Sequence, residues 1–156
     1  MISANRGATF TGNAGVENIA THLADAVLHG RLGEDAQRKK ILIVDDEASI
    51  RSTLLRMLQR ISGGSLKIAS VPSATEALEM LNHMEFDLVV IDDIMPGMNG
   101  WALAAKIKKR SRAKVLFVPG IRYLAELAGS PFDFYLEKPF NLKSLKGVIE
   151  EIFEGD

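Results

Sequence analysis

The sequence predicts an α/β fold in which a parallel, doubly wound sheet of five strands carries helices on both faces. Along residues 40–156, short apolar segments alternate with segments of helical periodicity. The third apolar segment, 86–91, has apolar residues at all but one position, which is typical of a strand that is covered on both faces. Acidic residues follow two of the apolar segments directly, at the strand ends where open parallel sheets bind their ligands.

The predicted elements alternate along the chain. The strands are expected at 41–44, 66–69, 86–91, 115–118 and 134–136, and the helices at 49–61, 73–84, 100–109, 121–128 and 142–153. The helix over 49–61 has one apolar face, and the glycines at 63–64 are expected to end it. Ser73 and Glu76 form a capping box that begins the next helix.

The second half of the region contains the strongest loop signal. After the strand over 86–91, the pairs Pro96-Gly97 and Asn99-Gly100 interrupt regular structure before the next helix begins. The helix expected over 121–128 is short and weakly patterned. The last helix, 142–153, completes the alternation.

Residues 1–39 are predicted to form an extension outside this fold, and 40–156 the main domain. Residues 1–15 are rich in Gly, Ala, Asn and Thr and are expected to be a mobile tail. Residues 16–32 have apolar side chains at helical spacing, which predicts an amphipathic helix. Because an isolated helix of this length is marginal in water, we expect it to dock on the domain, within one chain or across a homodimer.

The composition excludes several classes of function. A chain of 156 residues with 47% hydrophobic content suits a single core of ordinary size. A net charge of −1 gives no global attraction to nucleic acid or to an anionic membrane, and the absence of cysteine excludes disulfides and thiolate metal sites. No apolar run reaches the roughly 18 residues that a membrane span needs, and a leader pattern is absent. The expected location is therefore the cytoplasm.

Four charged side chains follow three of the predicted strands. Asp45 and Asp46 follow the first strand, Asp92 follows the third, and Lys138 follows the fifth. Because the carboxyl ends of parallel strands meet at one edge of a sheet, these side chains are expected to converge on one crevice. Carboxylates gathered in this way bind a hard divalent cation or leave one of their number protonated. The alternative, in which each acid caps a helix, accounts for any one of them but poorly for all in this order.

These residues resemble the receiver domain of two-component response regulators. The resemblance covers residues 39–153 and places Asp45-Asp46 at the acidic pair of the family, Asp92 at its phosphoacceptor and Lys138-Pro139 at its lysine and cis-proline. It implies a flavodoxin-like sheet with strand order 2-1-3-4-5. The four-residue step from Asp92 to Pro96 favours Asp92 over the adjacent Asp93 as the acceptor.

The resemblance also implies a role for each group at the site. Asp46, Asp92 and the backbone carbonyl of Ile94 would ligate Mg²⁺ directly, and Asp45 would hold it through water. The groups expected to contact the phosphoryl oxygens are the Lys138 side chain and the backbone N–H groups of Asp93 and Gly120.

One position departs from the family pattern. Pro119 stands where the family has a Ser or Thr, whose hydroxyl binds the phosphoryl group and whose movement is linked to an aromatic residue at the position of Tyr135. Proline has neither a hydroxyl nor an N–H, so phosphorylation is expected to persist with an altered switch. Considered alone, Tyr135 is more often a half-buried core aromatic than a switch.

The leading interpretation is a stand-alone cytoplasmic receiver that takes a phosphoryl group on Asp92 from a histidine kinase or phosphotransfer protein, with Mg²⁺. It would signal by contact with a downstream protein and would not be an enzyme beyond its own phosphorylation and dephosphorylation. The alternatives are a binding module that works without phosphate, because of Pro119, and an aspartate-nucleophile phosphatase, which would need an acid where Ile94 stands. The basic run 106–114 is expected to be a solvated helix end, not a nucleic-acid site.

Overall fold

A parallel five-stranded sheet forms the centre of the computed structural model, which describes residues 38–120 and 129–155. The strands are β1 (Lys40–Val44), β2 (Lys67–Val71), β3 (Leu88–Asp92), β4 (Lys114–Val118) and β5 (Phe134–Tyr135). They lie in the order β2-β1-β3-β4-β5, and every neighbouring pair is parallel. The doubly wound sheet predicted from the alternating pattern, and the strand order implied by the resemblance, are therefore confirmed. The predicted helices over 16–32 and 121–128, and the predicted tail, lie outside the described residues.

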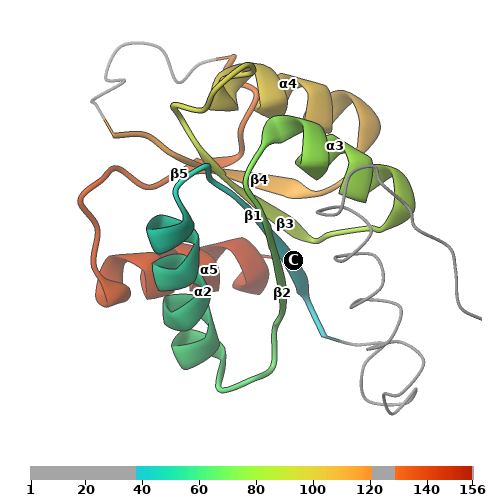
Figure 1. The fold of residues 1–156 in the computed structure, drawn as a ribbon. Helices are drawn as coiled ribbons and strands as arrows, with labels where there is room; N and C mark the ends of the chain where they lie inside the picture. Colours follow the sequence, from blue (N-terminus) through green and yellow to red (C-terminus); the bar gives the residue numbers. More distant parts are fainter. Residues whose placement is uncertain (1–37, 121–128, 156) are drawn as a thin grey trace, which may run out of the picture.

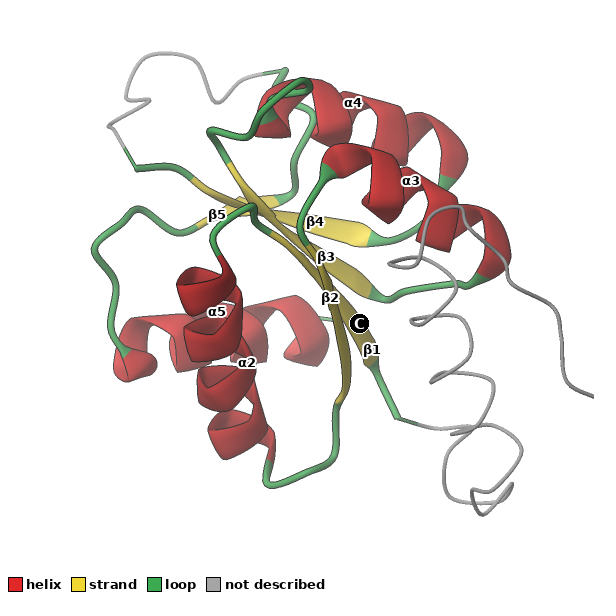
Figure 2. Cartoon of the chain, in the orientation of Figure 1, coloured by secondary structure: helices red, strands yellow, loops and turns green. Residues whose placement is uncertain are grey.

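Helices cover both faces of the sheet. They are α2 (Ala48–Ser62), α3 (Ala74–His83), α4 (Gly100–Arg110) and α5 (Leu142–Glu154). The helices α3 and α4 lie on one face, and α2 and α5 on the other (Figure 1 and Figure 2). No helix in the described part of the chain is both long and apolar enough to span a membrane.

Each face of the sheet has its own hydrophobic core, because successive strand residues point to opposite sides. Leu42, Val89 and Val115 contribute to the core under α3 and α4, and Ile43 and Val90 to the core under α2 and α5. All five side chains are at most 1% exposed. Full burial of each such side chain contributes about 1.5–3 kcal/mol relative to exposure, which explains why the central strands are apolar on both faces.

Short polar motifs determine where the helices begin and end. Gly63, with a φ of 57°, ends α2 as predicted. The Ser73 side chain accepts the Glu76 N–H at 3.2 Å, but its hydroxyl faces the Glu76 carboxylate, so only half of the predicted capping box forms. A complete capping box, which the sequence analysis did not predict, joins Asn141 and Ser144 at the start of α5.

The start of α4 lies directly against the end of β3. Gly100 is the first residue of α4, and its N–H donates to the Asp93 carbonyl at 2.9 Å. A Cβ at this position would overlap the carbonyl oxygen of Asp92 and press on the Phe117 ring. Only glycine permits so close an approach of the helix to the strand that carries Asp92.

Replacing Gly100 with Ala should therefore lower the free energy of unfolding by about 2 kcal/mol or more, because a backbone carbonyl cannot move aside as a side chain can. The matched control is Gly147→Ala in α5, where a Cβ meets no atom within 4 Å. That change should raise stability by about 0.5–1 kcal/mol through helix propensity. Chemical denaturation of both variants checks this account, and a Gly100→Ala protein as stable as the parent would contradict it.

Candidate functional site

Three carboxylates meet at the carboxyl edge of the sheet. Asp45 and Asp46 follow β1, and Asp92 is the last residue of β3, the strand that neighbours β1. One carboxylate oxygen from each residue lies within 4.8 Å of the other two. Asp45 is buried and Asp46 is exposed, so the cluster is open to solvent on one side only. The structure thus brings together the three acids that the sequence analysis selected.

Lys138, which follows β5, completes this cluster. Its Nζ lies 2.7 Å from Asp92 Oδ1 and 3.8 Å from Asp45 Oδ2. Its backbone N–H donates to the Pro119 carbonyl at 2.9 Å, which fixes the segment after β5 to the end of β4. The Lys138-Pro139 peptide bond is cis, as the resemblance implied. Lys138 and the candidate acceptor Asp92 are therefore in direct contact.

The local electrostatics favour a divalent cation. Burial raises the pKa of Asp45, and the neighbouring charges of Asp92 and Asp46 raise it further. The Glu47 N–H, which donates to Asp45 Oδ1 at 2.8 Å, and the Lys138 ammonium act in the opposite direction. One ammonium thus faces three carboxylates, and the excess negative charge with all-oxygen ligands fits Mg²⁺.

Arg51 supports the turn that carries the acidic pair. It lies in the first turns of α2, and its Nη1 donates to the backbone carbonyl of Asp45 at 2.7 Å. The bond ties the end of β1 to the helix that follows it. The sequence analysis missed this residue, although its place one turn into the helix after the acids was a usable signal.

The adjacent Asp93 points away from the cluster. It is 6% exposed and is not among the acids that gather at the edge, as strand alternation requires. None of Asp45, Asp46 and Asp92 occupies the N-cap position of a helix in the described residues. That position is taken by Glu47 before α2 and by Asn99 before α4. The structure therefore gives no support to the helix-capping alternative.

The remaining predicted positions surround this edge. Pro119 is buried at the end of β4, the next residue, Gly120, is exposed, and Ile94 is 68% exposed in the loop after β3. Tyr135 is 48% exposed and belongs to neither core, so it is not the core aromatic that the sequence favoured. Phe134 packs against the core under α2 and α5, whereas Tyr135 points to the opposite face at the edge of the sheet and is not part of the core on that face.

Comparison with known proteins identifies the family. Residues 41–150 match the response regulator receiver domain. The chemotaxis protein CheY of Pseudomonas aeruginosa is 36% identical over 121 residues, which cover 74% of this chain and 96% of that protein. The probable transcriptional regulator ycf27 of Porphyridium aerugineum is 30% identical over 74% of this chain, and the chain spans 48% of its length.

Solved structures agree with the sequence matches. The response regulator TrrA of Thermotoga maritima, solved in complex with Mg²⁺-BeF, superposes with a TM-score of 0.67 at 32% identity, over 74% of this chain and 99% of that one. TrrA in complex with the histidine kinase ThkA superposes with a TM-score of 0.66 at 32% identity, over 74% and 98% of the two chains. The chain belongs to the response regulator receiver domain family.

Proposed function

We propose that this protein accepts a phosphoryl group on Asp92 from a histidine kinase or a phosphotransfer protein, in a Mg²⁺-dependent step, and signals by contact with a downstream protein. The observation that carries the proposal is the contact of Asp92 with Lys138 at 2.7 Å inside a cluster of three carboxylates. The relatives support it, because TrrA was solved both with Mg²⁺-BeF and with a histidine kinase. The protein would be a phosphoacceptor, not an enzyme that acts on a separate substrate.

The transfer needs a nucleophile, a charge partner and room for the phosphoryl group. A carboxylate oxygen of Asp92 attacks phosphorus, the bond from phosphorus to the donor nitrogen breaks, and that nitrogen keeps the electron pair. Lys138 then exchanges part of its contact with Asp92 for a phosphoryl oxygen, which keeps its charge compensated. Gly120, which is exposed and has open space around it, can offer its backbone N–H to the same group.

The metal would be held by the acids at the same edge. Asp46, Asp92 and the Ile94 carbonyl are the proposed direct ligands, with Asp45 acting through water. When bound, the ion would supply positive charge that offsets the repulsion between the acceptor carboxylate and an incoming phosphoryl group. Asp45, which is buried and hydrogen-bonded to the Glu47 N–H, would keep this side of the site in place.

A second candidate function is a binding module that does not depend on phosphate. It is favoured by one observation, the buried Pro119 at the position where the resemblance implies a hydroxyl. The phosphatase alternative gains nothing from the structure, because the exposed Ile94 offers no acid where that chemistry needs one. The cytoplasmic location, the homodimer and the domain boundary at residue 39 stay predictions.

The choice of acceptor can be tested by mass spectrometry of the intact protein after incubation with acetyl phosphate and Mg²⁺. The parent should gain one phosphoryl group, and Asp92→Asn should gain none, because the nucleophilic oxygen is lost. Asp93→Asn is the matched control, with the same change one residue away at a side chain outside the acidic cluster, and should still be labelled. Labelling of the Asp92→Asn protein, or no labelling of the parent, would reject the assignment.

Charge crowding at Asp45 predicts a dependence of stability on pH. Because burial raises the pKa of Asp45, this group favours folding while it is protonated, and that contribution is lost as the pH rises through its folded pKa. Without divalent cations, Asp45→Asn should therefore melt at a higher temperature than the parent at neutral pH. The difference should narrow as the pH falls through the raised folded-state pKa of Asp45, because the parent carboxyl then also becomes neutral.

The same variant should gain less stability from Mg²⁺ than the parent, because one carboxylate near the ion is gone. Asn keeps an oxygen that can accept the Glu47 N–H, so the turn itself is preserved. Thermal melts with chelator and with Mg²⁺ check both expectations. If Asp45→Asn is less stable than the parent in chelator at neutral pH, the charge-crowding account is wrong.

A further inference from the structure

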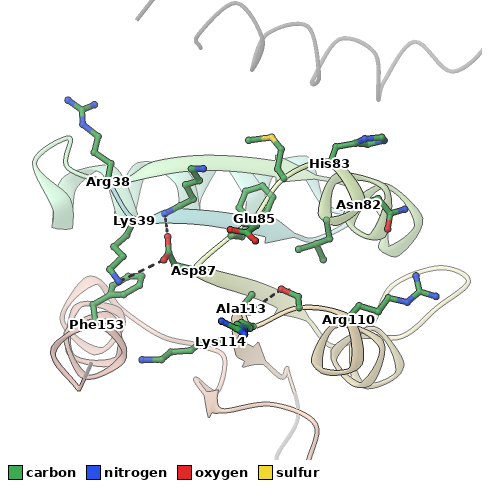
Figure 3. A pocket seen from close by; sticks show the side chains of 16 residues that line it. Arg38, Lys39, Asn82, His83, Glu85, Asp87, Arg110, Ala113, Lys114 and Phe153 are labelled. Carbon is green, nitrogen blue, oxygen red and sulfur yellow. Dashed lines mark hydrogen bonds and ion pairs between the residues drawn. The ribbon is translucent and has the colours of Figure 1, made fainter. Parts of the chain in front are cut away.

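A basic pocket lies at the amino edge of the sheet, opposite the acidic site. It has a volume of about 1120 Å³ and opens where β1, β3 and β4 begin, between the ends of α3, α4 and α5 (Figure 3). Its walls come from the segment before β1, the α3–β3 and α4–β4 connections, and Phe153 of α5. None of the residues that line it belongs to the acidic cluster.

The charge of this pocket is opposite to that of the rest of the chain. Six lysine and arginine residues line it against two acids, and these residues are Arg38, Lys39, Lys40, Arg110, Arg112 and Lys114, with Glu85 and Asp87. The whole chain has 19 basic and 20 acidic residues, so 13 basic and 18 acidic residues remain elsewhere. A concentration of positive charge in a hollow attracts anions.

Helix ends explain only a small part of this charge. Cations commonly gather at the C-terminus of a helix, but of the six only Arg110 lies in the last turn of a helix. Lys114 is held in place by a bond from its Nζ to the Ile152 carbonyl at 2.6 Å. Within the described part of the chain, the exposed side chains of Arg110 and Arg112 have no hydrogen-bond or ion-pair partner.

The two acids divide the positive charge into two groups. Asp87 accepts the Lys40 N–H at 2.7 Å and lies 3.8 Å from the Lys39 ammonium, which places it beside the segment before β1. Arg110 lies across the opening from Lys39, at the end of α4 (Figure 3). Arg112 lines the pocket from the connection that follows α4. A compact polyphosphate would bring dense negative charge close to Asp87 and Glu85. An extended ligand with spaced carboxylates meets both basic groups and avoids this repulsion.

Size and lining also favour an extended ligand. The volume slightly exceeds the range of about 300–1,000 Å³ that is typical of small-molecule pockets. Leu81, Met84 and Phe153 are partly buried in its walls and offer apolar contacts between the charges. A polypeptide supplies both kinds of group along one chain, whereas a phosphate backbone supplies mainly charge.

We propose that the basic pocket at the amino edge of the sheet binds an acidic segment of a partner protein. Arg110 and Arg112 would pair with carboxylates of that segment, and the partly buried apolar side chains would contact its other residues. The pocket and the phosphoacceptor site lie at opposite edges of the sheet, so both can be occupied at once. The proposal therefore goes beyond phosphoryl transfer and does not depend on it.

The test is fluorescence anisotropy of a labelled glutamate-rich peptide with the full chain. The reference peptide has Gln in place of every Glu. The acidic peptide should bind and the neutral one should not, and the affinity should fall as salt is added. The double variant R110E/R112E should bind about tenfold more weakly or worse, because it replaces two attractions by two repulsions.

The matched control is R56E/R60E on α2, which changes the same charge at exposed positions, one of them in the last turn of a helix. Neither residue lines the pocket, so binding should stay within about twofold of the parent. Arg112→Gln, a milder change in the loop after α4, should give a smaller loss in the same direction. All variants should unfold in a single cooperative thermal transition, like the parent, which shows that they fold.

Three results would overturn the proposal. The first is absence of binding of the acidic peptide by the parent. The second is equal affinity for the parent, R110E/R112E and Arg112→Gln, since the arginines would then contribute nothing. The third is tighter binding of a single-stranded oligonucleotide of equal charge, with the same loss in R110E/R112E, since the pocket would then be a nucleic-acid site.

Discussion

The ion pair between Lys138 and Asp92 is the interaction on which the site depends. The sheet brings three carboxylates within 4.8 Å of one another, and burial adds to the cost of the charge on Asp45. Lys138, with its Nζ 2.7 Å from Asp92, is the cation that the structure places among them. Its own position depends on the bond of its N–H to Pro119 at the end of β4. Charge compensation and strand order are therefore coupled, because the lysine reaches the acids only when β5 follows β4 in the sheet.

The two edges of the sheet carry opposite charges, and this polarity follows from the chain order. All strands run in one direction, so the acids that end β1 and β3 share one edge, and the basic residues that precede β1 and β4 share the other. The close approach of Gly100 to the end of β3 keeps α4 against the acidic edge, while the other end of the same helix presents Arg110 to the basic one. One helix thus joins the proposed phosphoryl site to the proposed site for an acidic segment.

Periodicity predicted the fold because the central strands are buried on both faces. A short, almost entirely apolar segment such as 86–91 is typical of a strand buried in this way. The acidic site was predictable because its residues follow strands directly. Side-chain geometry was not predictable in the same way. The exposure of Tyr135 depends on the place of β5 at the edge of the sheet, and the bond from Arg51 to the Asp45 carbonyl depends on the Arg51 rotamer. The basic pocket joins segments that are distant in sequence. The run 106–114, which the sequence analysis interpreted as a solvated helix end, contributes only part of its lining.

The measurement that tests this account most directly is the stabilisation of Lys138→Met by Mg²⁺, compared with that of the parent. If Lys138 compensates the three carboxylates, its removal leaves them to repel one another, so the variant should melt at a lower temperature in chelator. Mg²⁺ should then raise its melting temperature by more than it raises that of the parent, because the ion no longer shares the acids with an ammonium. If Mg²⁺ raises the melting temperature of Lys138→Met by no more than that of the parent, the central claim that Lys138 compensates the charge of the three carboxylates is contradicted.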